Sequence, residues 1–208
     1  MSAAQSSIVL FLSGMVVGMM IQAPKIPASY DRGQADVRLQ IARDIATAEA
    51  EEDARCTLPS WTPPNVLRWR VDICRAADAH GVAPDLLAIL VTVESGGHPG
   101  AVSGAGAIGL TQVMPRFWPR ILEDPYNPQH QLDVGASIMG KHLDTYGNVN
   151  QAAAAYNGGN PSNWDNAQTR AYRKWIVGMW NERNDATSPT LDAWRAAGGS
   201  ALLAREDA

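Results

Sequence analysis

Apolar residues that recur every three to four positions restrict the fold of this chain more than any other feature. The run 131–146 shows this spacing at Leu132, Gly135, Ala136, Met139 and Leu143. Segments 66–80, 84–95, 150–156 and 169–180 read as further helices between Gly- and Pro-rich turns. No comparable run alternates polar and apolar residues as a half-buried strand would. The sequence therefore predicts a mainly α fold.

Changes in composition divide the 208 residues into four expected parts. Residues 1–25 form an apolar N-terminal segment. Residues 26–60 form a linker, whose part 33–55 is rich in Ala, Asp, Glu and Arg and predicts a solvated spacer helix. Three prolines between 59 and 64 mark a break, and the main domain is expected at 61–180. The polar tail 181–208 either packs a last short helix around Leu191 and Trp194 or is loose.

The formal net charge of −4 argues against a protein that holds nucleic acid electrostatically. The two cysteines, Cys56 and Cys74, lack the spacing of zinc ligands, and the four histidines are scattered. We therefore expect no metal and no cofactor. The cysteines form a disulfide if the domain works outside the cytoplasm, or remain two buried or reduced thiols, and the sequence leaves both interpretations open.

The N-terminal segment carries no charged side chain from Ser2 to Pro24. It lacks the basic start and the small-x-small cleavage site of a secretory signal. Residues 3–23 reach the roughly 20 residues that a helix needs to cross a bilayer. An uncleaved membrane anchor is the leading interpretation, with a cleaved signal and an interfacial or buried helix as alternatives.

Glu94 is the candidate proton donor. Pro84 favours the start of its helix, and Gly96 favours the end. Glu94 falls on the side of the apolar stripe formed by Leu87, Leu90 and Val91. The negative end of the helix dipole and the flanking core both raise the pKa of a carboxyl, as a general acid near neutral pH requires. Taken alone, a Glu in a last helical turn is more often a solvated surface residue.

Three further motifs follow Glu94-Ser95 in the chain. They are Gly104-Ala105-x-Ala107-x-Gly109-Leu110-Thr111-Gln112-x-Met114-Pro115, Ala155-Tyr156-Asn157-Gly158, and Thr169-x-x-Tyr172-x-x-x-Ile176. In this order, the set resembles the soluble lytic transglycosylase domain, a relative of goose-type lysozyme. The resemblance covers roughly residues 66–179 and implies a lysozyme-like helical domain that cleaves the glycan strands of peptidoglycan.

The resemblance also implies roles for single residues. Glu94 is the sole catalytic acid/base, with Ser95 beside it. The implied substrate-binding residues are Ser103 and Gln112 along the cleft, Met114 in its sugar-contacting wall, Asn157, and Tyr156, whose hydroxyl bonds the catalytic carboxyl. Tyr172 is expected to be closer to structure than to chemistry. Thr111 and Gly158 depart from the residues usual in these motifs, which leaves fine substrate preference open.

The family mechanism that the resemblance implies needs one carboxyl group. Glutamic acid protonates the glycosidic oxygen and then, as a base, helps the 6-hydroxyl of the substrate close a 1,6-anhydro ring on muramic acid. Hydrolysis by a lysozyme-like muramidase is the alternative and needs a second acid. The candidates are Asp133 and Asp144, expected to be solvated, and Asp124, in a Pro-flanked loop. A catalytically inactive glycan-binding protein is a further alternative, against which the joint retention of Glu94, Gln112 and Tyr156 argues.

The biological setting is less determined than the reaction. Small size and the unusual N-terminus fit local wall opening by a phage particle or by a secretion or conjugation apparatus, whose proteins would be partners. The expected location is a membrane anchor facing the periplasm and cell wall, or the virion, with secretion as the alternative. Lys25 and Arg32 follow the apolar segment, and this charge bias would hold the domain in the cytoplasm, where peptidoglycan is absent. Because of this conflict, the virion remains an alternative location for the protein.

Overall fold

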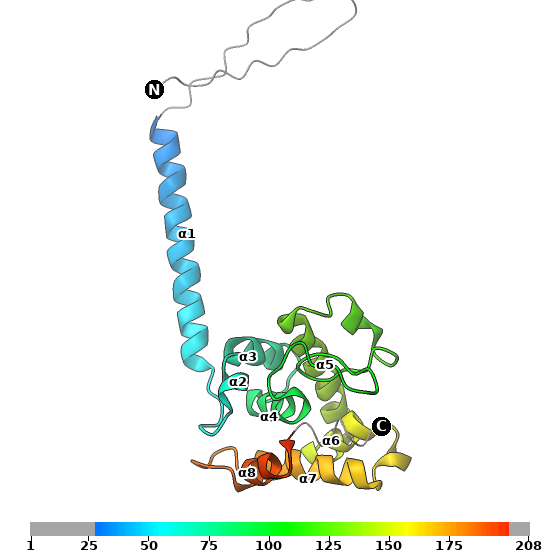
Figure 1. Cartoon of the computed structure of the whole chain (residues 1–208). Helices are drawn as coiled ribbons and strands as arrows, with labels where there is room; N and C mark the ends of the chain where they lie inside the picture. Colours follow the sequence, from blue (N-terminus) through cyan, green and yellow to red (C-terminus); the bar gives the residue numbers. More distant parts are fainter. Residues whose placement is uncertain (1–27, 200–208) are drawn as a thin grey trace, which may run out of the picture. The chain divides into compact units, whose positions relative to one another are not determined.

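Helices account for most of residues 28–199, the part of the chain that this computed structural model describes (Figure 1). Within it, pairing between extended segments is limited to isolated bridges in the loop around Ile108. The mainly α prediction is confirmed. The expected N-terminal hydrophobic helix at 1–25 lies outside the described residues. The elements are α1 Ala28–Arg55, α2 Pro64–Leu67, α3 Arg70–Ala79, α4 Pro84–Ser95, η1 Pro119–Leu122, α5 Pro128–Tyr146, α6 Val149–Gly158, η2 Pro161–Asn163, α7 Ala167–Asn181 and α8 Pro189–Ala196.

Helix α1 has the exposure of a solvated helix. Its described side chains from 34 to 47 all face water. Even its large apolar residues are more than half exposed; these are Val37, Leu39, Ile41 and Ile45. A helix without a buried stripe gains little from packing, so its own backbone hydrogen bonds and local propensity must support it.

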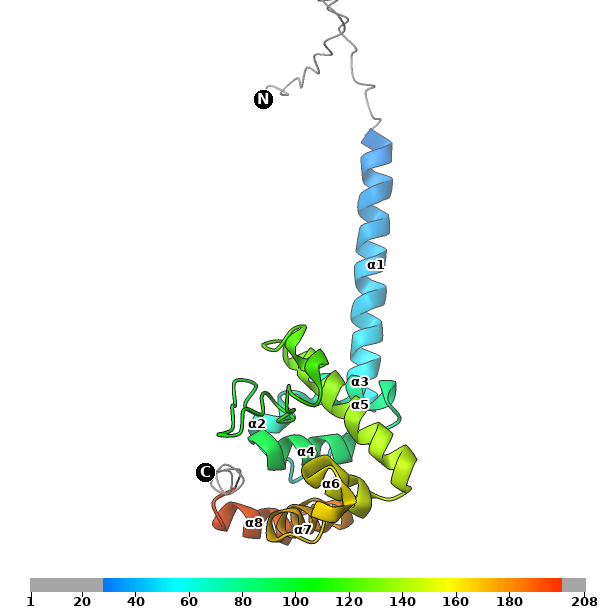
Figure 2. The same cartoon turned by 90° about the vertical axis from the view of Figure 1, so that its right-hand side faces the viewer.

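The core of the unit formed by residues 50–199 is built around α4. Every residue from Leu86 to Val93 is buried, and α4 packs against α2, α3 and α7. Both views place α4 between α3 on one side and the α7–α8 pair on the other (Figures 1 and 2). The single apolar stripe expected for this helix was too narrow a prediction, because a helix that is apolar on all faces is enclosed on all faces.

The segment 66–80, predicted as one helix, is divided into α2 and α3. Arg68 and Trp69 lie between the two helices, and both side chains donate to the carbonyl oxygen of Gly97, at 2.8 and 3.0 Å. The helix predicted at 84–95 forms with these bounds as α4, and the other predicted helices form with ends shifted by a few residues. Asn127 caps α5 ahead of Pro128, and Asn166 caps α7.

The tail is packed as far as it is described. Helix α8 lies against α7, and Leu191 and Trp194 belong to the main core. The Ser188 hydroxyl caps α8 by accepting from the Leu191 amide at 3.1 Å. Of the two expectations for 181–208, the packed short helix is therefore the one observed, while residues 200–208 lie outside the described part.

A disulfide joins Cys56 to Cys74. It connects the segment that follows α1 to α3, and the Arg70 guanidinium donates to the Cys56 carbonyl oxygen at 2.6 Å. Of the two interpretations that the sequence left open, the structure shows the bonded pair.

Between residues 28 and 199, no single helix combines the length and the apolar composition needed to cross a membrane. The bent pair α3 and α4 satisfies both measures only when the two helices are taken together.

Candidate active site

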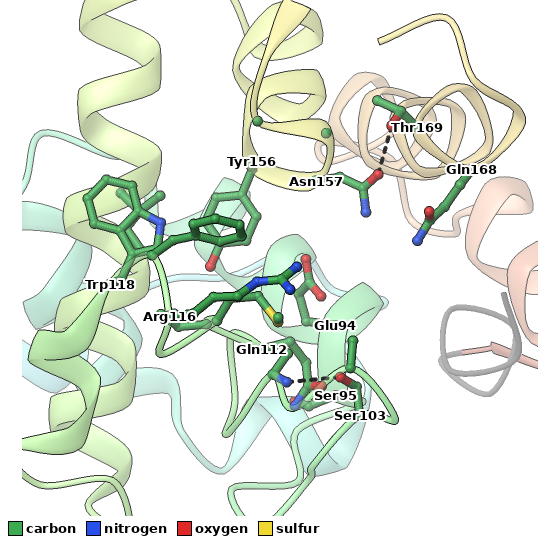
Figure 3. A pocket seen from close by; sticks show the side chains of 18 of the residues that line it. Glu94, Ser95, Ser103, Gln112, Arg116, Trp118, Tyr156, Asn157, Gln168 and Thr169 are labelled. Carbon is green, nitrogen blue, oxygen red and sulfur yellow. Dashed lines mark hydrogen bonds between the residues drawn. The ribbon is translucent and has the colours of Figure 1, made fainter. Parts of the chain in front are cut away.

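A cleft with a volume of about 1210 Å³ opens at the C-terminal end of α4 (Figure 3). Its walls come from the loop 98–118, α5, the end of α6 and the start of α7. The cleft exceeds the range typical of small-ligand pockets, roughly 300–1,000 Å³, and has room for several sugar units. Seven residues singled out in the sequence line it: Glu94, Ser95, Ser103, Gln112, Met114, Tyr156 and Asn157.

The end of α4 is fixed by its glycines. Gly96 adopts the left-handed conformation, with φ of 61°, and caps the helix through the Thr92 carbonyl. Gly97 follows at φ of 85°, where a Cβ atom would lie 2.3 Å from the Asn65 carbonyl oxygen. This turn ends α4 directly after Glu94 and Ser95, and both residues line the cleft.

Glu94 is partly exposed to the cleft and otherwise enclosed by protein. Burial raises the pKa of its carboxyl group to about 8, and a hydrogen bond from Tyr172 acts in the opposite direction. The carboxyl is therefore protonated at neutral pH and can donate a proton.

The tyrosine bound to Glu94 is not the one that the resemblance implied. The Tyr172 hydroxyl, fully buried behind the cleft, donates to Glu94 Oε1 at 2.6 Å. The Tyr156 hydroxyl instead donates to the Thr111 carbonyl oxygen at 2.8 Å. The hydrogen bond to Glu94 that was expected of Tyr156 is therefore made by Tyr172. Tyr156 is a wall residue that also fastens the loop around Thr111.

Gln131 holds the cleft loop in place. This fully buried side chain accepts from the Leu110 amide at 2.8 Å and donates to the carbonyl oxygens of Pro99 and Pro125 at 2.9 and 2.7 Å. The Ser95 hydroxyl adds a bond to the Leu110 carbonyl oxygen at 2.8 Å. The loop thus has fixed attachments to both α4 and α5.

Gln112 has the positive φ of 47°, which is uncommon for a residue other than glycine. Its side-chain amide donates to the carbonyl oxygens of Ala101 and Gly109 at 3.1 and 2.9 Å. Gln112 therefore shapes the loop as well as lining the cleft. Across the cleft, Asn157 accepts from the Thr169 hydroxyl at 3.0 Å (Figure 3).

No second carboxylate from the described residues lines the cleft beside Glu94. Asp124 is exposed and accepts from Asn127 at 2.9 Å. Asp133 is partly buried, which raises its pKa, but hydrogen bonds from His80 and Arg120 outweigh burial and lower it. Neither Asp133 nor Asp144 is a lining residue. The position that a second acid would need is therefore not filled by any of the three candidates.

Sequence reasoning missed several cleft residues, among them Arg116, Trp118 and Gln168 (Figure 3). It also missed Gln131, for which a signal existed. Gln131 occupies the same helical face as Gly135 and Met139, so a polar side chain stands at a core position. A buried amide at such a position must have hydrogen-bond partners.

The part of the sequence that forms this cleft matches a known protein family. The sequence model of the transglycosylase SLT domain matches residues 73–176, half of the chain. The chain belongs to this family. The SLT match begins in α3, ends in α7 and includes Glu94 and all three further motifs.

Among similar proteins is the "Transglycosylase" of Enterobacteria phage PRD1, 39% identical over 108 residues, covering 51% of this chain and 40% of the relative. Another is the "Endo-type membrane-bound lytic murein transglycosylase A" of Klebsiella pneumoniae, 38% identical over 100 residues, covering 40% of this chain and 49% of the relative. This SLT-domain chain thus aligns with about half or less of the length of these relatives.

Proposed function

We propose that this protein is a peptidoglycan lytic transglycosylase. It would cleave the β-1,4 bond between N-acetylmuramic acid and N-acetylglucosamine and leave a 1,6-anhydro end. The observation that carries the proposal is Glu94, the single carboxyl group among the described residues that line the cleft, protonated at neutral pH and hydrogen-bonded by Tyr172. A hydrolase of the usual two-carboxylate design would need a partner across the bond, which the three aspartates do not supply.

The reaction needs one proton donor that later becomes a base. Glu94 gives its proton to the glycosidic oxygen as the C1–O bond breaks, and the acetamido oxygen of the muramic residue bonds to C1. The Glu94 carboxylate then takes the proton of the 6-hydroxyl as O6 attacks C1 and displaces the acetamido oxygen. The carboxyl group regains its proton and no water is consumed. Since the pKa of Glu94 lies near 8, both forms are accessible at working pH.

The remaining cleft residues have supporting roles in this proposal. Ser103, Gln112, Met114, Tyr156 and Asn157 contact the glycan, because all five line the cleft. Ser95 fixes the loop to the helix that carries Glu94, through the Leu110 carbonyl. Tyr172 positions and tunes the carboxyl group of Glu94.

Glu94→Gln tests the assignment. The amide has nearly the same size but cannot give and take the proton, so release of soluble fragments from sacculi should fall by about 100-fold or more. Asp124→Asn is the matched control, because it makes the same change in an exposed carboxyl outside the cleft, and it should keep wild-type turnover. Circular dichroism checks that both variants fold. If Glu94→Gln kept more than about a tenth of the wild-type activity, Glu94 would not be the catalytic acid and base.

We propose local wall opening, by a phage particle or a secretion or conjugation apparatus, as the setting of this activity. One relative is a phage transglycosylase and another is named membrane-bound. The Cys56–Cys74 disulfide fits a protein that works in an oxidising compartment. Residues 1–25 would anchor the chain to a membrane facing the wall, and a soluble mature chain that starts near Pro24 in fractionation and intact-mass measurements would show secretion instead.

A further inference from the structure

Arg116 stands out among the residues that line the cleft. It is the only Arg or Lys in the wall formed by the described residues, in a chain whose net charge is −4. The carboxyl group of Glu94 in the same wall is neutral near pH 7, because its pKa is about 8. The cleft therefore presents one fixed positive charge to whatever enters it.

The guanidinium group has no carboxylate partner within the described part of the chain. Its contact is with Phe117, over whose ring the Arg116 Cζ atom lies at 4.6 Å from the centroid. Phe117 also lines the cleft, and its side chain is 65% exposed. Arg116 extends into the same pocket as Glu94 and Asn157 (Figure 3).

This arrangement leaves the donors of the guanidinium free. A guanidinium group over an aromatic ring is attracted to the ring through its charge, while its N–H groups remain available to an acceptor. Such a fork matches the two oxygens of a carboxylate. The sugar rings and acetamido groups of the glycan carry no charge, so a carboxylate must come from the muramic lactyl group or from the peptide attached to it.

We propose that Arg116 is a specificity-determining residue that favours glycan whose muramic residues carry a carboxylate. The inference rests on the proposed function, since it concerns the substrate of the same cleft. The carboxylate has two sources, the stem peptide or, in strands stripped of peptide, the lactyl group itself. Either would pair with the Arg116 guanidinium while the scissile bond lies at Glu94.

The experiment compares glycan strands with free carboxylates against the same strands after chemical amidation, each prepared with and without stem peptides. Wild type should cleave the charged strands with a kcat/KM about three- to tenfold higher than the amidated ones, and added salt should narrow the ratio. Arg116→Gln should bring the ratio close to one, and Arg116→Lys should keep part of it. Lys174→Gln, which removes a cation stacked on Trp175 outside the cleft, should show the wild-type ratio.

A ratio that survives in peptide-stripped strands assigns the lactyl carboxylate, and one seen only in peptide-bearing strands assigns the stem peptide. The proposal is overturned if wild type does not discriminate, if Arg116→Gln keeps the ratio, or if both Arg116 variants lose activity equally on charged and amidated strands. Failure of wild type to cleave any of the four substrates would instead refute the proposed function.

Discussion

Two opposing effects set the acidity of Glu94. Burial favours the neutral carboxyl, and the hydrogen bond from Tyr172 favours the carboxylate. The first prevails and places the pKa near 8. A side chain with this balance is a proton donor in neutral solution and a base once it has donated.

The pH dependence of kcat/KM should report this pKa. The protonated fraction of Glu94 falls as pH rises through about 8, so the rate should decline about tenfold per unit above it. Initial rates on labelled sacculi between about pH 5 and about pH 10 measure this decline, the alkaline limb of the pH profile, and circular dichroism confirms that the protein stays folded. An alkaline limb near pH 4.5, the ordinary value of a glutamate, would contradict the burial argument.

Exchanging each cleft tyrosine for phenylalanine separates their roles. Tyr172→Phe removes the bond that lowers the pKa of Glu94, so the alkaline limb should move to higher pH, with kcat reduced by roughly three- to tenfold. Tyr156→Phe loses a bond to the Thr111 carbonyl and should leave the limb in place. If Tyr156→Phe shifts the limb and Tyr172→Phe does not, the hydrogen-bond assignment is wrong.

The position of Glu94 was predictable from the chain, and its partner was not. The helix start at Pro84, the glycines after Ser95 and the apolar stripe together indicate a carboxyl near the core at a helix end. Tyr156 and Tyr172 lie on different helices, α6 and α7, and which hydroxyl reaches Glu94 depends on how α7 packs against α4 and α6 against α7. The spacing of the motifs along the chain does not predict the distance from either tyrosine hydroxyl to the Glu94 carboxyl group.

At the scale of elements, the cleft wall is a loop held by a helix. Gln131, in the first turn of α5, satisfies one amide and two carbonyl groups of the segments that border the cleft. Close packing reinforces the attachment, because a Cβ atom on Gly109 would lie 2.4 Å from the Gln131 side chain. The geometry of the wall therefore depends on one buried amide.

Replacing that amide should damage both stability and activity. Gln131→Leu leaves the buried Leu110 amide and the part-buried carbonyl groups of Pro99 and Pro125 without this partner. A buried unsatisfied group costs about 1–3 kcal/mol and the two carbonyls add less, so the free energy of unfolding should drop by about 2 kcal/mol or more. Urea denaturation measures the loss, and sacculus digestion should decline in parallel. Gln129→Leu, two residues earlier and exposed, is the matched control and should change stability by less than about 1 kcal/mol. Equal stability of the two variants would refute the role of Gln131.

Helix existence was easier to predict than helix continuity. Periodicity identified the helices of the core, and Asn and Pro residues explain their starts. The break between α2 and α3 has no Gly or Pro to signal it. It arises because Arg68 and Trp69 turn to bind the Gly97 carbonyl, a contact between segments nearly 30 residues apart. The helix propensities of neighbouring residues do not predict a break that depends on a contact so distant in the sequence.

At the scale of the whole molecule, the SLT match covers the part of the chain that forms the cleft, in which Glu94 is the one carboxyl group among the described lining residues. The matched residues 73–176 contain Glu94, Tyr172 and Gln131. Helix α1 lies before that match, and the disulfide joins Cys56, also before it, to Cys74 at its beginning. The reaction that this protein catalyses and the place where it acts are therefore separate questions, and the reaction has the more direct test.

Mass spectrometry of digested sacculi decides between transglycosylation and hydrolysis. With Glu94 as the single acid, the products should be muropeptides that end in 1,6-anhydromuramic acid, lighter by one water than the products of a hydrolase. Digestion in water enriched in oxygen-18 should leave these ends unlabelled, because no water enters the bond. Reducing muramic acid ends that carry the heavy oxygen would contradict the one-carboxylate mechanism and return attention to Asp124.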